Sequence, residues 1–143
     1  MKVKVKKLYP AAILPTYATE GSACFDLYAL TNGDADHGEP GTFRTGLAFE
    51  IPEGYVMKVY SRSGHGFKND TRLANCVGII DSDYRGELMV KLTCDKPGWG
   101  LAISAGERIA QAMIEKVSQV EFEQVEELSE TSRGQGGFGS TGK

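Results

Sequence analysis

The chain has 143 residues, 24% of them charged, and a net charge of -3. This length suits one domain with its own core, and the weak net charge excludes a broad field for nucleic acid or an anionic membrane. Cys24, Cys76 and Cys94 form no CxxC pair, which argues against a disulfide framework or a zinc site. With no apolar run typical of a signal peptide or membrane span, we expect a cytoplasmic protein without stable nucleic-acid or membrane partners.

Short alternating or apolar runs, separated by Gly, Pro, Asp and Asn, predict strands along most of the chain. In chain order we expect strands over residues 2–8, 23–30, 45–51, 55–61, 76–80 and 87–93. Many short strands at this spacing are typical of a sandwich or barrel. The segment 108–128 is ambiguous, because its first half fits an amphipathic helix as well as a strand, whereas VSQVEFEQV at 117–125 alternates and favours a strand.

The densest polar cluster is GIIDSDYRGE at residues 78–87. The turn-rich DSDYRG between two apolar runs predicts the end of a hairpin. Asp81 follows two Ile residues, where partial desolvation would make its carboxylate a better base. Taken alone, however, the local pattern favours a turn-forming role for Asp81 and Asp83.

A second cluster, YSRSGHGFKND, covers residues 60–70. Arg62, Ser63 and the backbone of Gly64 are suited to hold an anion. The glycines that flank His65 predict a loop. A hydrolase triad is not indicated, because the GxSxG frame is absent and the chain contains only two His residues.

A third cluster, PGWGLAISAGERIAQ, ends at Gln111. Gln111 stands among apolar neighbours and needs a hydrogen-bond partner, for which a structural group is the default. Glu107 and Arg108 are expected to be surface or interface charges.

The tail RGQGGFGSTGK at residues 133–143 contains a GxxxxGK match to a phosphate-binding P-loop. That motif needs a strand before it and a Ser or Thr and a helix after the Lys, so we interpret the match as coincidence. Phe138 is almost the only apolar residue after residue 128, and such a segment cannot order itself alone. We therefore expect a domain over residues 1–128 and a flexible Gly-rich C-terminal arm over residues 129–143.

Five stretches together resemble, in order and spacing, the five motifs of the trimeric dUTP pyrophosphatase (dUTPase) family. They are GSACFDLYA at 21–29, SRSG at 61–64, GIIDSDYRGE at 78–87, GERIAQ at 106–111 and RGQGGFGSTG at 133–142. The resemblance implies an all-β, jelly-roll-like β-barrel subunit in a homotrimer that shares its active sites between subunits. It also implies Mg2+-dependent hydrolysis of dUTP to dUMP and pyrophosphate, which limits uracil incorporation into DNA and supplies dUMP for thymidylate synthesis.

The resemblance further implies a role for individual residues. Asp81 would activate the water that attacks the α-phosphorus, and Tyr84 would pack on the deoxyribose and leave no room for a 2′-hydroxyl. The uracil edge would be read by one side chain and a stretch of backbone, at Asn75, Gly78, Ile79, Ile80 and Met89. Mg2+ would be held mainly by triphosphate oxygens and water, with Asp26 as indirect support for the metal and water network.

The phosphates would be contacted from two parts of the chain. The residues of the body with this implied role are Arg62, Ser63, Gly64 and Gln111. In the arm, which would close over the site of a neighbouring subunit, Arg133 would approach the γ-phosphate and Phe138 would stack on the uracil. Gly139, Ser140 and Thr141 would surround the phosphates.

Three residues depart from the usual motifs of this family. Cys24 stands where a small Gly is common, Ser61 where Pro usually precedes the Arg, and His65 where Leu is typical. None of the three has an implied chemical role, so we expect them to affect loop shape and subunit packing rather than the reaction type.

The dCTP deaminase branch also resembles this family, in fold and in parts of the second to fourth motifs. Those deaminases use a Glu on the strand after the hairpin, where this chain has Lys91. Zinc-dependent deaminases are excluded, because the HxE and PCxxC signature is absent. A jelly roll that only binds nucleotides or a protein partner is the remaining alternative, which the full set of catalytic positions makes the weaker choice.

Overall fold

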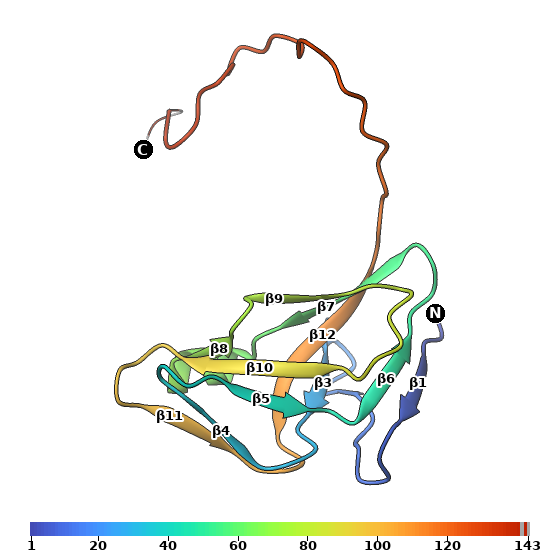
Figure 1. Cartoon of the computed structure of the whole chain (residues 1–143), viewed down its shortest axis with the longest axis vertical. Helices are drawn as coiled ribbons and strands as arrows, with labels where there is room; N and C mark the ends of the chain where they lie inside the picture. Colours follow the sequence, from blue (N-terminus) through green and yellow to red (C-terminus); the bar gives the residue numbers. More distant parts are fainter. Residues whose placement is uncertain (141, 143) are drawn as a thin grey trace.

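We describe the chain from a computed structural model, which covers residues 1–140 and 142. In these residues it contains twelve strands and one short helix (Figure 1). The elements up to the helix are β1 (Lys4–Lys7), β2 (Thr16–Tyr17), β3 (Phe25–Tyr28), β4 (Gly33–Asp36), β5 (Gly41–Arg44), β6 (Leu47–Glu50) and β7 (Tyr55–Tyr60). They are followed by α1 (Ser63–Asn69), β8 (Thr71–Leu73), β9 (Val77–Ile80), β10 (Met89–Cys94), β11 (Gly100–Ile103) and β12 (Arg108–Lys116).

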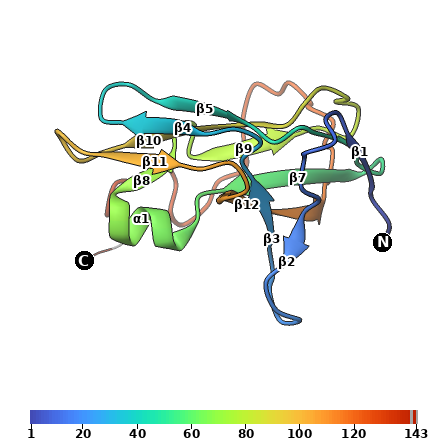
Figure 2. The same ribbon diagram turned by 90° about the horizontal axis from the view of Figure 1, so that it is seen from below.

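The strands form four antiparallel sheets, which confirms an all-β fold. The largest sheet has the order β2-β3-β12-β7-β9, and a three-stranded sheet has the order β5-β10-β8. The pairs β1-β6 and β11-β4 complete the set, so the described residues form separate sheets and not one closed barrel. Figure 2 shows β5 and β10 on one side of the molecule and β7 and β12 on the other.

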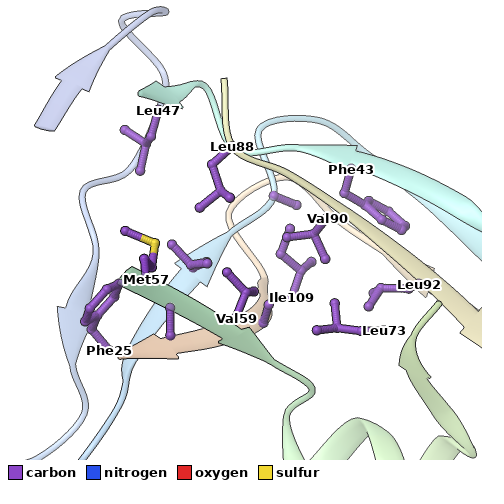
Figure 3. Packing of buried hydrophobic residues seen from close by; sticks show 14 of the residues in the cluster. Phe25, Phe43, Leu47, Met57, Val59, Leu73, Leu88, Val90, Leu92 and Ile109 are labelled. Atoms are coloured by element: carbon purple, nitrogen blue, oxygen red, sulfur yellow. The ribbon is translucent and has the colours of Figure 1, made fainter. Parts of the chain in front are cut away.

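The core lies between these two layers, because strands of each present their apolar side chains inward. In β10, Val90 and Leu92 are buried while the alternate residues Met89 and Lys91 are exposed. Figure 3 shows Val90 and Leu92 facing Val59 of β7 and Ile109 of β12. Each large apolar side chain buried in this way contributes about 1.5–3 kcal/mol to folding.

The structure confirms the predicted strand regions in the first two thirds of the chain, which hold β1, β3, β6, β7, β9 and β10. It also resolves the ambiguity at residues 108–128. The first half is the strand β12, which pairs with β3 on one side and β7 on the other. The second half differs from our prediction, because residues 117–128 lie in no strand.

Residues 78–87 do not end a hairpin, and that prediction was wrong. β9 pairs with β7 in the five-stranded sheet, whereas β10 pairs with β5 and β8 in another sheet. The turn-rich DSDYRG therefore connects two sheets, and the two strands that flank it diverge instead of pairing.

The predicted loop around His65 is also wrong, because residues 63–69 form α1. Arg62 precedes the helix in an extended conformation, with φ -86° and ψ 135°. The helix ends at Asp70, whose φ of 49° is left-handed and whose backbone N–H donates to the carbonyl of His65. This hydrogen bond stabilises the C-terminal end of the short helix and offsets in part the low helix propensity of Gly64 and Gly66.

Beyond β12 the chain leaves the body and runs in an arc away from the other elements (Figure 1). Val117 still donates its N–H to the carbonyl of Gly54 at 2.8 Å. From residue 118 on, the hydrogen bonds of the described residues all join two members of this same segment. No helix among the described residues is long and apolar enough to span a membrane.

Candidate active site

The first hollow lies where β9 and β10 diverge, and we call it the β9–β10 hollow. Its volume is about 410 Å³. Its lining includes every residue predicted to read the uracil edge, namely Asn75, Gly78, Ile79, Ile80 and Met89. The remaining lining residues are Val59, Leu73, Ala74, Leu88, Val90 and Lys91.

The divergence of the strands explains what this hollow can bind. Among the described residues, β9 is the edge strand of its sheet and pairs only with β7, so its outward N–H and C=O groups have no strand partner there. Such groups are available for main-chain hydrogen bonds to a bound molecule. At Gly78 a Cβ would lie 3.1 Å from the Cβ of Val59 and 3.9 Å from Nδ2 of Asn75, so a side chain there would crowd the wall of the hollow.

A second hollow, which we call the β3–β12 hollow, has a volume of about 300 Å³. It brings together Asp26, Arg62, Ser63 and Gln111, which the sequence places far apart. Gly64 is not among its lining residues, although it directly follows Ser63 in α1. The other lining residues are Ala18, Ser22, Ala23, Cys24 and Arg108.

Asp26 holds two cations in this second hollow. Its side chain is 11% exposed, and its carboxylate accepts hydrogen bonds from Nε of Arg62 at 3.1 Å and from Nη1 of Arg108 at 3.2 Å. Two guanidinium groups around one carboxylate leave one net positive charge beside the hollow. The remaining N–H donors of both Arg side chains make the cluster suited to an anion such as a phosphate group.

The role of Arg108 was missed, because we expected a surface or interface charge. In a regular strand, residues 108 and 111 would face opposite sides. Here the register of β12 against β3 shifts between Arg108 and Ala110, and this irregularity brings Arg108 and Gln111 to the same hollow. In the sequence, the only indication of a role for Arg108 was its place in the family motif GERIAQ, which also contains Gln111.

Gln111 finds the structural partner that its apolar neighbours require. Its Nε2 donates to the backbone carbonyl of Ser61 at 2.9 Å. The Ser61 hydroxyl in turn accepts the backbone N–H of Leu73 at 2.9 Å, a bond that a Pro at this position would not make. Together these bonds fix the backbone that leads directly into Arg62.

The two other departures from the usual motifs lie near the same cations. Cys24 lines the β3–β12 hollow, and burial, followed by the charge of Asp26, raises the pKa of its thiol. Burial, followed by the charge of Arg62, lowers the pKa of His65 in α1. His65 Nδ1 is buried and has no hydrogen-bond partner among the described residues.

The loop that carries Asp81 and Tyr84 lies between β9 and β10. Both side chains are exposed, and neither lines one of the two hollows. The Tyr84 N–H donates to the Asp81 carbonyl at 3.3 Å, and the Tyr84 hydroxyl donates to the Glu87 carbonyl at 3.1 Å. The loop is therefore held by hydrogen bonds between its own residues, while the carboxylate of Asp81 and the ring of Tyr84 are accessible to a ligand or a neighbouring surface.

The arm residues lie apart from both hollows. Arg133 donates from Nε to the carbonyl of Gly136 at 2.7 Å, and the side chain of Phe138 is fully exposed. The backbone N–H of Ser140 donates to the carbonyl of Gly137, two residues before Gly139. Thr141, which was predicted to contact phosphate, lies outside the described residues.

Comparisons with known proteins agree on one family. The dUTPase family model matches residues 11–142. The deoxyuridine 5′-triphosphate nucleotidohydrolase of Nautilia profundicola is 48% identical over 143 residues, all of both chains. That of Helicobacter pylori is 41% identical over 144 residues, which cover 99% of this chain and 97% of the relative. The all-β fold, the β9–β10 hollow and the separate cationic hollow thus occur in a chain that belongs to the dUTPase family.

Solved structures extend this likeness to three dimensions. The dUTPase of Staphylococcus bacteriophage 80alpha with dUpNHpp superposes with a TM-score of 0.91 at 29% identity and covers 99% of both chains. A mutant dUTPase of phage phi11, described with a structural Mg(II) ion, has a TM-score of 0.80 and covers 89% of this chain and 98% of its own. At 24% identity, the phi11 structure supports the fold alone.

Proposed function

We propose that this dUTP diphosphatase works as a jelly-roll homotrimer whose active sites each combine parts of different subunits. The reaction of its family is the hydrolysis of dUTP to dUMP and pyrophosphate. The observation that supports shared sites is that the β9–β10 hollow and the β3–β12 hollow have no lining residue in common. In this proposal one nucleotide places its base in the β9–β10 hollow of one subunit and its phosphates against the β3–β12 hollow of another.

In this proposal the base enters the β9–β10 hollow. Its polar edge bonds to the free backbone of β9 around Gly78, Ile79 and Ile80 and to the amide of Asn75. Met89, which is 56% exposed at the rim, covers the base and leaves little room for a 5-methyl group. Tyr84 packs on the deoxyribose just outside the hollow.

The phosphates lie against the β3–β12 hollow of the neighbouring subunit. The free donors of Arg62, the Ser63 hydroxyl, the Gly64 backbone and Gln111 bind the phosphate oxygens. The residual positive charge around Asp26 attracts the triphosphate and strengthens these bonds in a partly desolvated setting. Gln111 contributes its remaining amide groups, because one N–H is already bonded to Ser61.

Magnesium fits this arrangement through the substrate. No group of three or more His, Cys, Asp or Glu residues that would hold a metal occurs among the described residues. Both oxygens of Asp26 already accept a guanidinium, so its carboxylate would reach a metal only through water. Mg2+ bound to triphosphate oxygens and waters would neutralise charge on the phosphates.

Asp81 acts as the general base for the water that attacks the α-phosphorus. The carboxylate accepts one proton from the water while the bond from the α-phosphorus to the bridging oxygen breaks and pyrophosphate leaves. Arg62 and its neighbours stabilise the negative charge that develops on the phosphate oxygens. Packing by a second subunit would desolvate the exposed carboxylate of Asp81 and strengthen it as a base.

The C-terminal arm over residues 129–143 closes the site. Arg133 approaches the γ-phosphate, Phe138 stacks on the uracil, and Gly139, Ser140 and Thr141 surround the phosphates. Support comes from the exposed position of Phe138 and from the arc that the segment makes away from the body (Figure 1). Closure over a bound nucleotide would exclude water from the reacting centre.

The boundary at residue 128 is part of the same proposal. In residues 117–128 the apolar side chains of Val120, Phe122, Val125 and Leu128 are exposed. Apolar side chains gathered on an exposed segment are typical of a surface that binds another protein. We propose that this segment docks on a neighbouring subunit, so that residues 1–128 act as the folded body within the trimer. The cytoplasmic location stays a prediction.

A mixed-trimer experiment tests the shared site. Asp81→Asn removes the base from one half of the site, and Arg62→Ala removes the cation from the other half. Chains with each substitution carry different affinity tags, are co-expressed, and trimers with both tags are isolated. In a ring of three with both kinds of chain, one site in three has an intact Asp81 and an intact Arg62, so about one third of wild-type turnover should return.

The two single-variant trimers are the controls, and both should be nearly inactive. If mixed trimers are as inactive as these controls while their mass shows three chains, each site lies within one subunit and the proposal fails. Product analysis on the wild type with dUTP, dCTP, dTTP and UTP accompanies the test. Pyrophosphate should form from dUTP and little from the others, and a uridine nucleotide formed from dCTP would instead support a deaminase.

A further inference from the structure

Three side chains from distant parts of the chain meet beside the loop of residues 81–86. They are Tyr9, Arg44 at the end of β5, and Glu87, and we call them the Tyr9–Arg44–Glu87 network. None of them lines either hollow or has a role in the proposed site. Their bonds nevertheless reach the residue that contacts the sugar.

Glu87 has the best-satisfied carboxylate of this region. Its Oε2 accepts hydrogen bonds from Nε of Arg44 at 2.9 Å and from Nη2 of Arg44 at 2.6 Å. Its Oε1 accepts the backbone N–H of Gly46 at 2.8 Å, and the side chain is 12% exposed. A carboxylate held by three donors fixes its own backbone much more firmly than a surface ion pair does.

Arg44 is itself held in place by Tyr9. Its Nη2 donates to the Tyr9 hydroxyl at 2.5 Å, and its guanidinium lies 4.6 Å from the centre of the Tyr9 ring. The residue after Glu87 is anchored as well, because Leu88 donates its N–H to Leu47 at 2.8 Å and accepts the Thr45 hydroxyl at 2.6 Å. The loop therefore ends on a rigid support.

Tyr84 rests on this support. Its hydroxyl donates to the backbone carbonyl of Glu87 at 3.1 Å. Its ring folds back over Gly86, where an added Cβ would lie 2.3 Å from the Tyr84 hydroxyl oxygen and 2.5 Å from Cζ. Tyr84 is 44% exposed, so the hydrogen bond to Glu87 and the absence of a side chain at residue 86 have a large part in deciding where its ring lies.

We infer that the Tyr9–Arg44–Glu87 network and Gly86 position the Tyr84 ring and thereby set the preference of the enzyme for 2′-deoxyribose over ribose. The inference rests on the proposed contact between Tyr84 and the sugar. A ring that excludes a single hydroxyl group has to be held to a fraction of an ångström, and an exposed loop alone does not supply that precision. The network acts through Tyr84, so its members are positioning residues.

The test measures kcat/KM for dUTP and for UTP in Arg44→Met, Glu87→Gln and Gly86→Ala. We expect the dUTP/UTP ratio to fall about tenfold in each, because the ring moves or loses its fixed position. Gly86→Ala displaces the ring directly and touches no ion pair, so it separates ring position from charge. Lys4→Met is the matched control, because it also removes an ion pair with a Glu, in which Nζ of Lys4 lies 2.7 Å from Oε1 of Glu50. This control should leave the dUTP/UTP ratio unchanged.

A Tyr84→Ala variant separates failure of this inference from failure of the proposed site. If Tyr84→Ala leaves the ratio unchanged, Tyr84 does not contact the sugar and its proposed role fails. If Tyr84→Ala lowers the ratio while folded Arg44→Met, Glu87→Gln and Gly86→Ala keep it, the positioning role is overturned. Tyr9→Phe removes only the outermost hydroxyl and keeps the test decisive should Arg44→Met fail to fold. Hydrogen exchange of residues 81–88 should also be faster in Arg44→Met than in Lys4→Met.

Discussion

The two hollows of this chain present different chemistry. The β9–β10 hollow presents an open strand edge, mostly apolar side chains, one amide at Asn75 and one ammonium group at Lys91. The β3–β12 hollow instead presents two guanidinium groups on one buried carboxylate, at Asp26. A neutral planar base needs shape and backbone hydrogen bonds, whereas a triphosphate needs fixed positive charge. In the proposed function, one nucleotide is therefore bound by two hollows that share no lining residue.

The largest effect expected concerns a residue that belongs to neither hollow. Asp81→Asn should lower kcat by about 10²- to 10⁴-fold, because the amide keeps the shape of the carboxylate and cannot accept the proton from water. Binding of dUpNHpp should stay close to wild type, since both hollows remain intact. Single-turnover kinetics with dUTP and calorimetry with dUpNHpp measure the two quantities.

Retained turnover in Asp81→Asn would mean that Asp81 is not the general base and that a residue of one of the hollows has this role. Loss of dUpNHpp binding would show instead that Asp81 is part of the recognition surface. Either result would break the separation between recognition and catalysis.

A smaller effect should distinguish the proposed roles of the two hollows, because a change in the β3–β12 hollow should affect binding of the phosphates and not of the base. Asp26→Asn removes the charge that holds Arg62 and Arg108, so the phosphate-side donors lose their orientation. We expect the KM for dUTP to rise about tenfold, which is the scale of one charge-assisted hydrogen bond. Inhibition by deoxyuridine, which carries no phosphate, should be unchanged.

Lys58→Met is a suitable control for Asp26→Asn, because it breaks the ion pair with Glu115 at 2.5 Å between β7 and β12 and lines neither hollow. Equal loss of dUTP and deoxyuridine binding in Asp26→Asn would mean that the substitution distorts the whole fold. The phosphate-side assignment of the cluster would then be contradicted.

The same contrast explains how far the sequence could be interpreted. Local pattern suggested an anion site at Arg62 and Ser63 and a hydrogen-bond partner for Gln111, and only the family motifs grouped these residues in one phosphate site. It did not reveal Arg108, because the register shift in β12 changes which face a residue occupies. The family motifs led to the residues of the β9–β10 hollow, but local pattern predicted a hairpin there. Whether two flanking strands pair or diverge depends on contacts with β7 and β5, far along the chain.

Elements that escaped prediction have weak local signals. β4 consists of Gly, Ala and two Asp residues, and β11 begins with Gly, so neither short strand has the β-branched or aromatic residues that favour strands, apart from Ile103. α1 includes Gly64 and Gly66, which favour a loop by propensity, and tertiary context overrides that preference. In contrast, strands with long alternation, such as those over residues 55–60 and 89–94, were predicted within two residues of their ends.

The smallest effect expected concerns a partly buried charge next to the mostly apolar β9–β10 hollow. Leu88 lines the β9–β10 hollow and directly follows Glu87, whose pKa is lowered mainly by the hydrogen bonds from Arg44. A carboxyl with a lowered pKa in the folded state stabilises the fold above its unfolded value of 4.5, and this contribution is lost as the pH falls through the folded pKa. Arg44 keeps its charge throughout, because the same bonds raise its pKa.

Thermal unfolding of wild type and Glu87→Gln between about pH 7 and pH 3 measures this contribution. At neutral pH the variant should melt a few degrees lower, because the pair is partly exposed and its net contribution is modest. The gap should narrow as the pH falls below 4.5 and close once the pH is below the folded pKa of Glu87, where Glu87 of the wild type is protonated as well. A gap that stays constant with pH would mean that Glu87 acts through shape alone, and its charge would then contribute nothing to the stability of the residues that frame the β9–β10 hollow.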